Sequence, residues 1–177
     1  MERFEVKRGL VKQVDSQGGL EGLASEHFDE VHAGGGGGFG ASFGMLKNIS
    51  AHYSDDGKLV VEVDQLRGEE LNALLESEGG RERAMESRRR WSEFLDAATG
   101  YNGKQRGDKA KEQTKKLTKS KAAIKMAHKI MSLSSSLSDE KIKSALELIA
   151  EIETKLDEGN ATRAMSLSDK LNRLLGS

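Results

Sequence analysis

The residues best suited to chemistry in this 177-residue chain are the cations between Lys104 and Lys129. Nine lysines and one arginine in that stretch face only Asp108 and Glu112. Such a surplus attracts phosphate, and each phosphate that is neutralised steepens the salt dependence of binding. The excess of lysine over arginine favours non-specific phosphate contact rather than bidentate reading of bases. We expect the phosphate contacts to come from six cations: Lys104, Arg106, Lys109, Lys111, Lys115 and Lys116.

Two other interpretations of this basic segment stay open. Residues 1–80 carry 7 basic and 15 acidic side chains, whereas residues 81–129 carry 15 basic and 6 acidic ones. The basic segment can therefore be a solvated connector that is attracted to the acidic part of its own chain. It can also bind an acidic protein partner.

Other motifs that could carry chemistry are weaker. The G-x-S-x-G spacing around Ser42 fits a hydrolase nucleophile only on a strand–turn–helix, and the residues that follow Ser42 predict strand instead. The glycine run 34–38 satisfies the G-x-G-x-x-G pattern of dinucleotide-binding sites only because a run of glycines fits any glycine-rich pattern. It predicts a flexible loop between strands. His27 and His32 lie five residues apart, which does not place them on one helical face, so we expect no metal site. We predict no cofactor and no enzymatic activity.

Composition excludes further classes of site. The chain has no cysteine, which rules out disulfides, thiolate nucleophiles and cysteine-bound metals. The N-terminus alternates charged and apolar residues and lacks the apolar core of a signal peptide. No apolar run approaches the roughly 20 residues that a membrane-spanning helix needs. We expect a cytoplasmic protein without membrane contact.

The first hundred residues have the pattern of an α+β domain. Phe4 and Val6 alternate with charged residues, which predicts a half-buried strand, and a second strand is predicted where Leu59, Val61 and Val63 alternate with Val60, Glu62 and Asp64. Strands are also expected at 39–43 and 49–53, with a tight turn at 55–57. A helical region with a break near Gly79 and Gly80 follows, in which Trp91 and Leu95 are expected to pack on the sheet.

The remaining residues predict helices only. An apolar stripe over 123–131 ends at the serine-rich stretch 132–138, and two amphipathic helices then meet at Glu158-Gly159-Asn160. We expect a sandwich domain over 1–101, a basic helical arm over 102–137 and a helical hairpin over 138–177. The apolar faces of the hairpin need a partner, which is the rest of the chain or a second copy.

Several blocks resemble a small archaeal family of uncharacterised proteins: Phe4 to Gly9, Phe43 to Lys47, Lys58 to Val63, and Arg89 to Leu95 running into Thr99-Gly100-Tyr101. The resemblance covers about residues 1–116, and the Thr99-Gly100-Tyr101 junction is its most specific part. It implies a two-layer α/β sandwich, with a curved antiparallel sheet backed by helices and likened to half of a TATA-binding-protein fold. It implies no activity and no catalytic residue.

These observations predict a fold and a class of function. The fold is α+β, a two-layer sandwich with a mainly antiparallel sheet followed by a helical extension that ends in a hairpin. The function is that of a non-enzymatic binding or adaptor protein whose basic segment contacts nucleic acid (RNA or DNA) or, alternatively, an acidic protein. The alternative is a protein-interaction or oligomerisation module that acts through the C-terminal hairpin.

Overall fold

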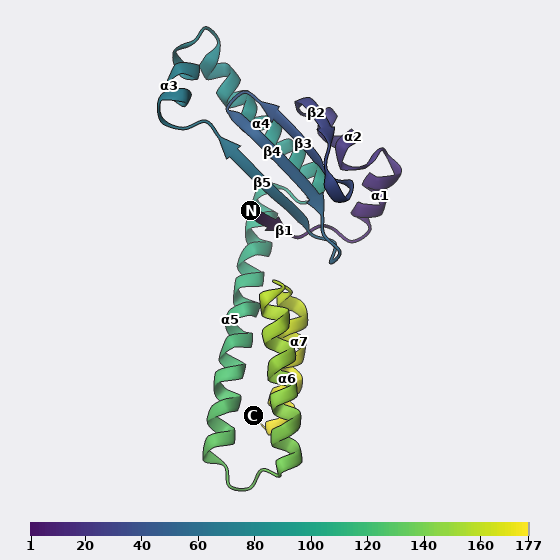
Figure 1. Cartoon of the computed structure of the whole chain (residues 1–177), viewed down its shortest axis with the longest axis vertical. Helices are drawn as coiled ribbons and strands as arrows, with labels where there is room; N and C mark the ends of the chain where they lie inside the picture. Colours follow the sequence, from purple (N-terminus) through teal and green to yellow (C-terminus); the bar gives the residue numbers. More distant parts are fainter. Residues whose placement is uncertain (177) are drawn as a thin grey trace. The chain divides into compact units, whose positions relative to one another are not determined.

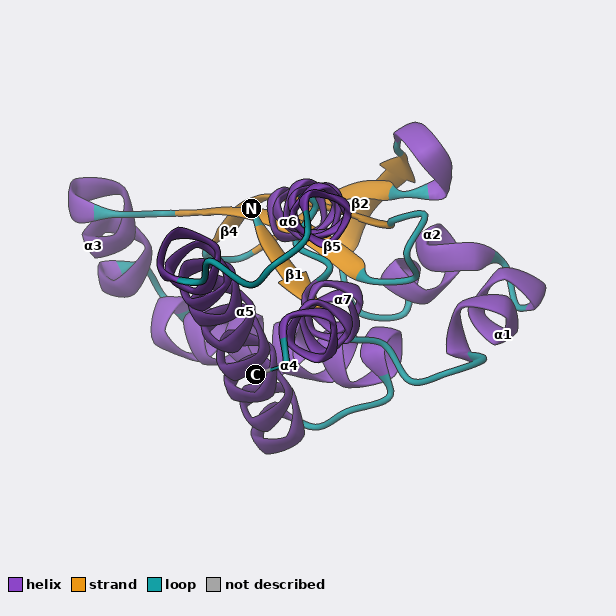
Figure 2. Cartoon of the chain, turned by 90° about the horizontal axis from the view of Figure 1, so that it is seen from below, coloured by secondary structure: helices purple, strands orange, loops and turns teal. Residues whose placement is uncertain are grey.

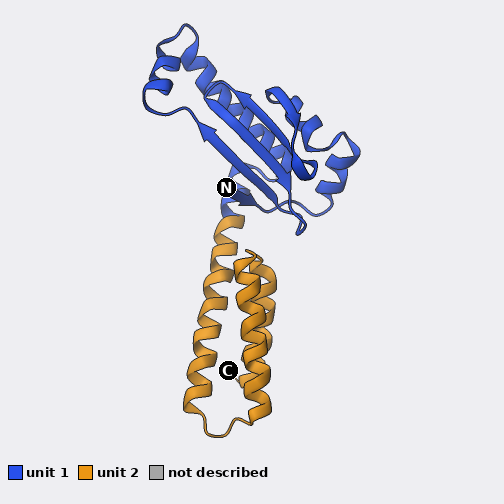
Figure 3. Cartoon of the chain, in the orientation of Figure 1, with its two compact units in different colours: residues 1–108 blue, residues 109–177 orange. Residues whose placement is uncertain are grey.

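The computed structural model describes residues 1–176, which divide into two compact units. Unit 1 is Met1–Asp108 and unit 2 is Lys109–Ser177 (Figure 3). One long helix, α5 (Gly103–Leu133), begins in unit 1 and continues into unit 2.

Unit 1 is built on a five-stranded antiparallel sheet with the strand order β1-β5-β4-β3-β2 (Figure 1). Every neighbouring pair except β1–β5 is consecutive in the chain, so short turns suffice to connect them. The register places Ala51 opposite both Phe39 and Val61, so one row of core side chains crosses three strands. The strands are β1 (Glu2–Phe4), β2 (Asp29–Ala33), β3 (Phe39–Phe43), β4 (Leu46–Tyr53) and β5 (Leu59–Gln65).

Helices cover one face of this sheet. In Figure 2 the long helix α4 lies along the strands, with α1 and α2 beside it. Phe94 of α4 is fully buried, and its ring meets those of Phe28 and Phe39 with centroids 5.3 and 5.2 Å away. The opposite face carries exposed side chains such as Ser50, His52 and Glu62, as expected for a sheet with one solvated side. The helices of unit 1 before α5 are α1 (Leu10–Ser16), α2 (Gly19–Ser25), α3 (Gly68–Glu76) and α4 (Gly80–Thr99).

The turn between β3 and β4 is fixed directly onto α4. Gly44 has φ +54, and a Cβ at this position would lie 2.2 Å from the Ser87 hydroxyl. Ser87 is completely buried and its oxygen accepts the N–H of Met45 at 3.1 Å. The absence of a side chain at Gly44 thus lets the turn approach the helix closely enough for this hydrogen bond.

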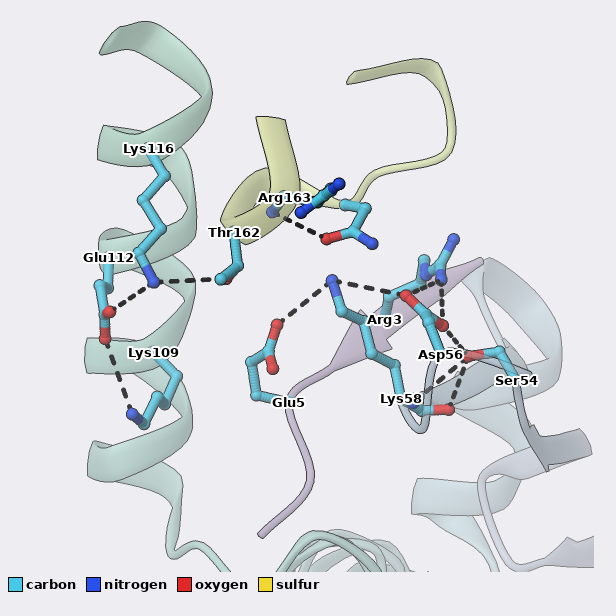
Figure 4. A network of polar contacts seen from close by, with 11 residues as sticks. Arg3, Glu5, Ser54, Asp56, Lys58, Lys109, Glu112, Lys116, Thr162 and Arg163 are labelled. Atoms are coloured by element: carbon cyan, nitrogen blue, oxygen red, sulfur yellow. Dashed lines mark hydrogen bonds and ion pairs between the residues drawn. The ribbon is translucent and has the colours of Figure 1, made fainter. Parts of the chain in front are cut away.

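Charged side chains join the edge strand β1 to the β4–β5 turn (Figure 4). The Arg3 guanidinium donates to the Asp56 carboxylate at 2.9 Å, and the Lys58 ammonium lies 3.2 Å from the Glu5 carboxylate. These partly exposed pairs reinforce the pairing of a strand that has only three residues.

Unit 2 packs the second part of α5 against a hairpin of α6 (Asp139–Asp157) and α7 (Ala161–Leu175). Ser138 caps α6 by accepting the Lys141 N–H, and Asn160 caps α7 by accepting the Arg163 N–H. The hairpin supplies most of the core, whereas α5 contributes a narrow seam of small residues. That core consists of Ala127, Ala145, Ile149, Ile152, Ala164, Leu167 and Leu171.

The α+β fold with a C-terminal helical extension is confirmed. Two local predictions were wrong: β1 ends at Phe4, so Val6 lies outside it, and Leu10–Ser16 forms a helix that the sequence did not predict. The glycine run forms a single 3-10 turn between β2 and β3. The division into three domains stays a prediction.

Candidate nucleic-acid interface

The basic segment begins at a defined helix start. The Asn102 side chain accepts the Gln105 N–H at 2.9 Å, and the Gln105 side chain accepts the Asn102 N–H at 3.0 Å. This reciprocal pair is a capping box, which satisfies two amide groups that the first turn of α5 leaves open. The preceding Gly100 ends α4 in the left-handed conformation, with φ 72. The segment Thr99-Gly100-Tyr101, the most specific part of the family resemblance, is therefore the turn from α4 to α5.

Arg106 differs from the other five predicted cations. Its side chain is only 8% exposed, and its guanidinium donates to the carboxylate of Asp96 and to the carbonyl of Tyr101. These contacts tie the first turn of α5 back to the end of α4. Because the guanidinium already has partners within unit 1, we leave Arg106 out of the phosphate contacts proposed below.

Lys109 and Lys116 share one carboxylate. The Glu112 carboxylate lies 2.8 Å from the Lys116 ammonium and 3.6 Å from that of Lys109 (Figure 4). The hydrogen bond from Lys116, with the charges of both lysines, lowers the pKa of Glu112. Lys116 also lies 3.4 Å from the Thr162 hydroxyl at the start of α7. The carboxylate offsets part of the positive charge of this pair.

Lys104, Lys111 and Lys115 are exposed. Lys111 and Lys115 are four residues apart, so they lie one above the other on the same side of α5. Beyond Glu112 the helix carries no acidic side chain: from Gln113 to Leu133 it has six lysines and no aspartate or glutamate. The surface charge of this part of α5 is therefore positive throughout.

Sequence reasoning missed the apolar residues that lie among these lysines. Met126 is 50% exposed and Leu133 is 75% exposed. Two hollows of about 340 and 300 Å3 adjoin Met126 on the surface of α5. The signal is present in the sequence, because Met126 and Leu133 are seven residues apart, but the neighbouring stripe over 123–131 has more apolar residues and hides it.

The other candidate groups occupy different parts of unit 1. Ser42 lies within β3, where its hydroxyl donates to the Glu30 carboxylate at 3.3 Å, and not at a strand-to-helix turn. A polar hollow of about 330 Å3 beside Ser42 is also lined by Asp29, Lys47 and Arg83. Within residues 1–176, no group of three or more histidine, aspartate or glutamate side chains has an arrangement that could hold a metal ion. Over the same residues, no helix is long and apolar enough to cross a bilayer.

Comparison with known proteins yields one result. Residues 1–112 match the family model described as Domain of unknown function (DUF5611). No curated protein and no solved structure matches the chain. The matched range covers unit 1 and the start of α5, including the first four predicted cations, and it ends before the acid-free part of the helix. An archaeal origin and a likeness to the TATA-binding protein stay predictions. The chain belongs to the DUF5611 family.

Proposed function

We propose that this protein is a non-enzymatic binding protein whose helix α5 contacts the phosphates of nucleic acid. The observation that carries the proposal is the run of six lysines without a carboxylate between Gln113 and Leu133. Apart from Lys116, which Glu112 partly neutralises, lysines in a stretch without carboxylates keep most of their attraction for an external anion. The lysines extend along several turns of α5, so they can contact several phosphates of a nucleic-acid backbone at once.

Of the six predicted cations, Lys104, Lys111 and Lys115 are exposed, and Lys115 belongs to the acid-free run. Lys109 and Lys116 contribute less, because Glu112 lies close to both ammonium groups. Since lysine acts as a point charge, binding of this kind discriminates little between sequences. An α-helix with its side chains is about 10–12 Å wide, so it is compatible in size with a major groove of about 12 Å.

The proposal is tested by fluorescence anisotropy with four labelled probes: single-stranded and double-stranded RNA and DNA of mixed sequence. At low salt we expect binding to at least one probe, with affinity that falls steeply as salt rises. Polyglutamate serves as a competitor, because it represents an acidic protein partner without phosphate. Displacement by polyglutamate as efficient as by unlabelled nucleic acid favours the acidic-protein alternative. Absence of binding at low salt refutes the proposal.

The oligomerisation alternative rested on the apolar stripes of the C-terminal hairpin. In the structure Ile149, Leu167 and Leu171 are buried in the core that the hairpin shares with α5. Those stripes already have a partner within the chain, which leaves nucleic-acid contact as the better supported function. Cytoplasmic location stays a prediction.

A further inference from the structure

Five exposed residues of α5 repeat with the alternating three- and four-residue spacing of a helix–helix seam. They are Lys119, Ala122, Met126, Lys129 and Leu133, called the α5 stripe below. Each of the two hollows beside Met126 is lined by three residues of this stripe, and Asn172 of α7 lies at the rim of one of them. Met126 and Leu133 are the large apolar side chains of this stripe, and exposed apolar side chains seven residues apart on one helix face favour contact with another helix.

A second stripe with the same spacing lies on α6. We call it the α6 stripe, and all of its residues are exposed: Lys143, Leu146, Ala150, Glu153 and Asp157. Leu146 is 48% exposed. Within residues 1–176, the large apolar side chains that stand exposed in unit 2 are Met126, Leu133 and Leu146, so all three belong to the two stripes.

The two stripes differ in charge. Residues 113–133 of α5 have six lysines and no carboxylate, whereas α6 has six carboxylates and three lysines. Pairing of one α5 stripe with another would place lysines close to lysines, which is unfavourable. Pairing of an α5 stripe with an α6 stripe instead places a lysine-rich helix surface against a helix with an excess of carboxylates. Each stripe spans about 21 Å at 1.5 Å per residue, so the lengths match.

We propose that a second copy of this chain docks its α6 stripe on the α5 stripe. The net charge of the chain is only −1, so there is little overall repulsion between copies. When two copies each dock the α6 stripe on the α5 stripe of the other, they form a closed two-fold dimer. When only one of the two contacts forms, the free stripes bind further copies and longer assemblies result. This inference uses a different surface from the buried hairpin core, and it does not depend on nucleic-acid binding.

Sedimentation velocity of the full chain at concentrations up to about 1 mM tests the docking. We expect association that Met126→Glu and Leu146→Lys each weaken at least about tenfold, because each inserts a charge into an apolar contact. Met85→Glu is the matched control, since Met85 is 67% exposed on α4 and belongs to neither stripe. A wild-type chain that stays monomeric throughout overturns the proposal, as does a control that weakens association as much as Met126→Glu.

Charge reversal provides a test that loss of folding cannot imitate. One variant carries Lys119→Glu and Lys129→Glu, and the other carries Glu153→Lys and Asp157→Lys. Each alone has like charges on both stripes and is expected to lose association at least about tenfold. Their mixture restores opposite charges at both contacts, so a mixed dimer is expected. Circular dichroism verifies that both variants remain helical. A mixture that associates no better than either variant alone refutes the pairing of α5 with α6.

Discussion

Replacement of Arg106 by Gln is expected to destabilise unit 1 without weakening phosphate binding. The guanidinium is nearly buried and donates to the Asp96 carboxylate and the Tyr101 carbonyl. Hydrogen bonds to charged groups contribute about 1.5–3 kcal/mol. Asp96 is 45% exposed, so water replaces part of the lost interaction and the lower half of that range applies. We therefore expect a loss of about 2 kcal/mol in the free energy of unfolding. The corresponding fall in Tm is roughly 8–16 °C for a domain of this size.

Urea unfolding followed by Trp91 fluorescence measures this loss. Trp91 is the only tryptophan in the chain and packs against Phe94 with ring centroids 5.7 Å apart, so its signal follows unit 1. Lys104→Gln is the matched control on the same helix. Lys104 is exposed near the positive end of the helix dipole, so its removal is expected to change stability by less than about 0.5 kcal/mol. The reasoning is refuted if Arg106→Gln unfolds at the wild-type urea concentration, or if the control costs as much.

Two further changes test the interior of unit 1 by the same fluorescence assay. Ser87→Ala removes the acceptor of the buried Met45 N–H and is expected to cost about 1–3 kcal/mol, whereas Ser92→Ala on the exposed side of α4 is near neutral. Equal stabilities of the Ser87→Ala and Ser92→Ala variants contradict a stabilising role of the hydrogen bond between Ser87 and Met45. Tyr53 is expected to make stability fall above about pH 10, because burial raises its pKa and the unfolded chain then releases the proton first. Tyr53→Phe flattens this decline, and a decline as steep as in the wild type argues against the burial of the hydroxyl.

The strands were predictable because their signal is local. Leu59, Val61 and Val63 alternate with Val60, Glu62 and Asp64, and the same alternation places them on the helix-covered face of the sheet. The helix Leu10–Ser16 escaped prediction for a physical reason. It has seven residues, starts at a glycine with φ 86 and has no capping side chain, so tertiary packing of residues such as Val14 must stabilise it.

The candidate interface was predictable as a segment but not residue by residue. In the sequence, nothing distinguishes Arg106 from the other cations of the basic segment. Only the turn at Gly100 brings Asp96, ten residues earlier, against its guanidinium. The apolar stripe over 123–131 was predictable, and Ala127, Ile124 and Met131 of that stripe pack with the hairpin, but its spacing did not reveal the second, exposed stripe through Met126. The structure buries Ala127 and leaves Met126 exposed, because small residues allow the helices to approach.

The central claim, that cations of α5 contact phosphate, is tested most directly by the salt dependence of binding. The chain with Lys104→Gln, Lys111→Gln and Lys115→Gln is compared with a control of equal charge, in which Gln replaces the exposed lysines 12, 141 and 170. For B-DNA, loss of three phosphate contacts reduces the slope of log K against log salt by about 2.7, at about 0.9 for each contact. We expect this reduction for the α5 variant and a slope close to the wild type for the control. Identical slopes for the two variants contradict it.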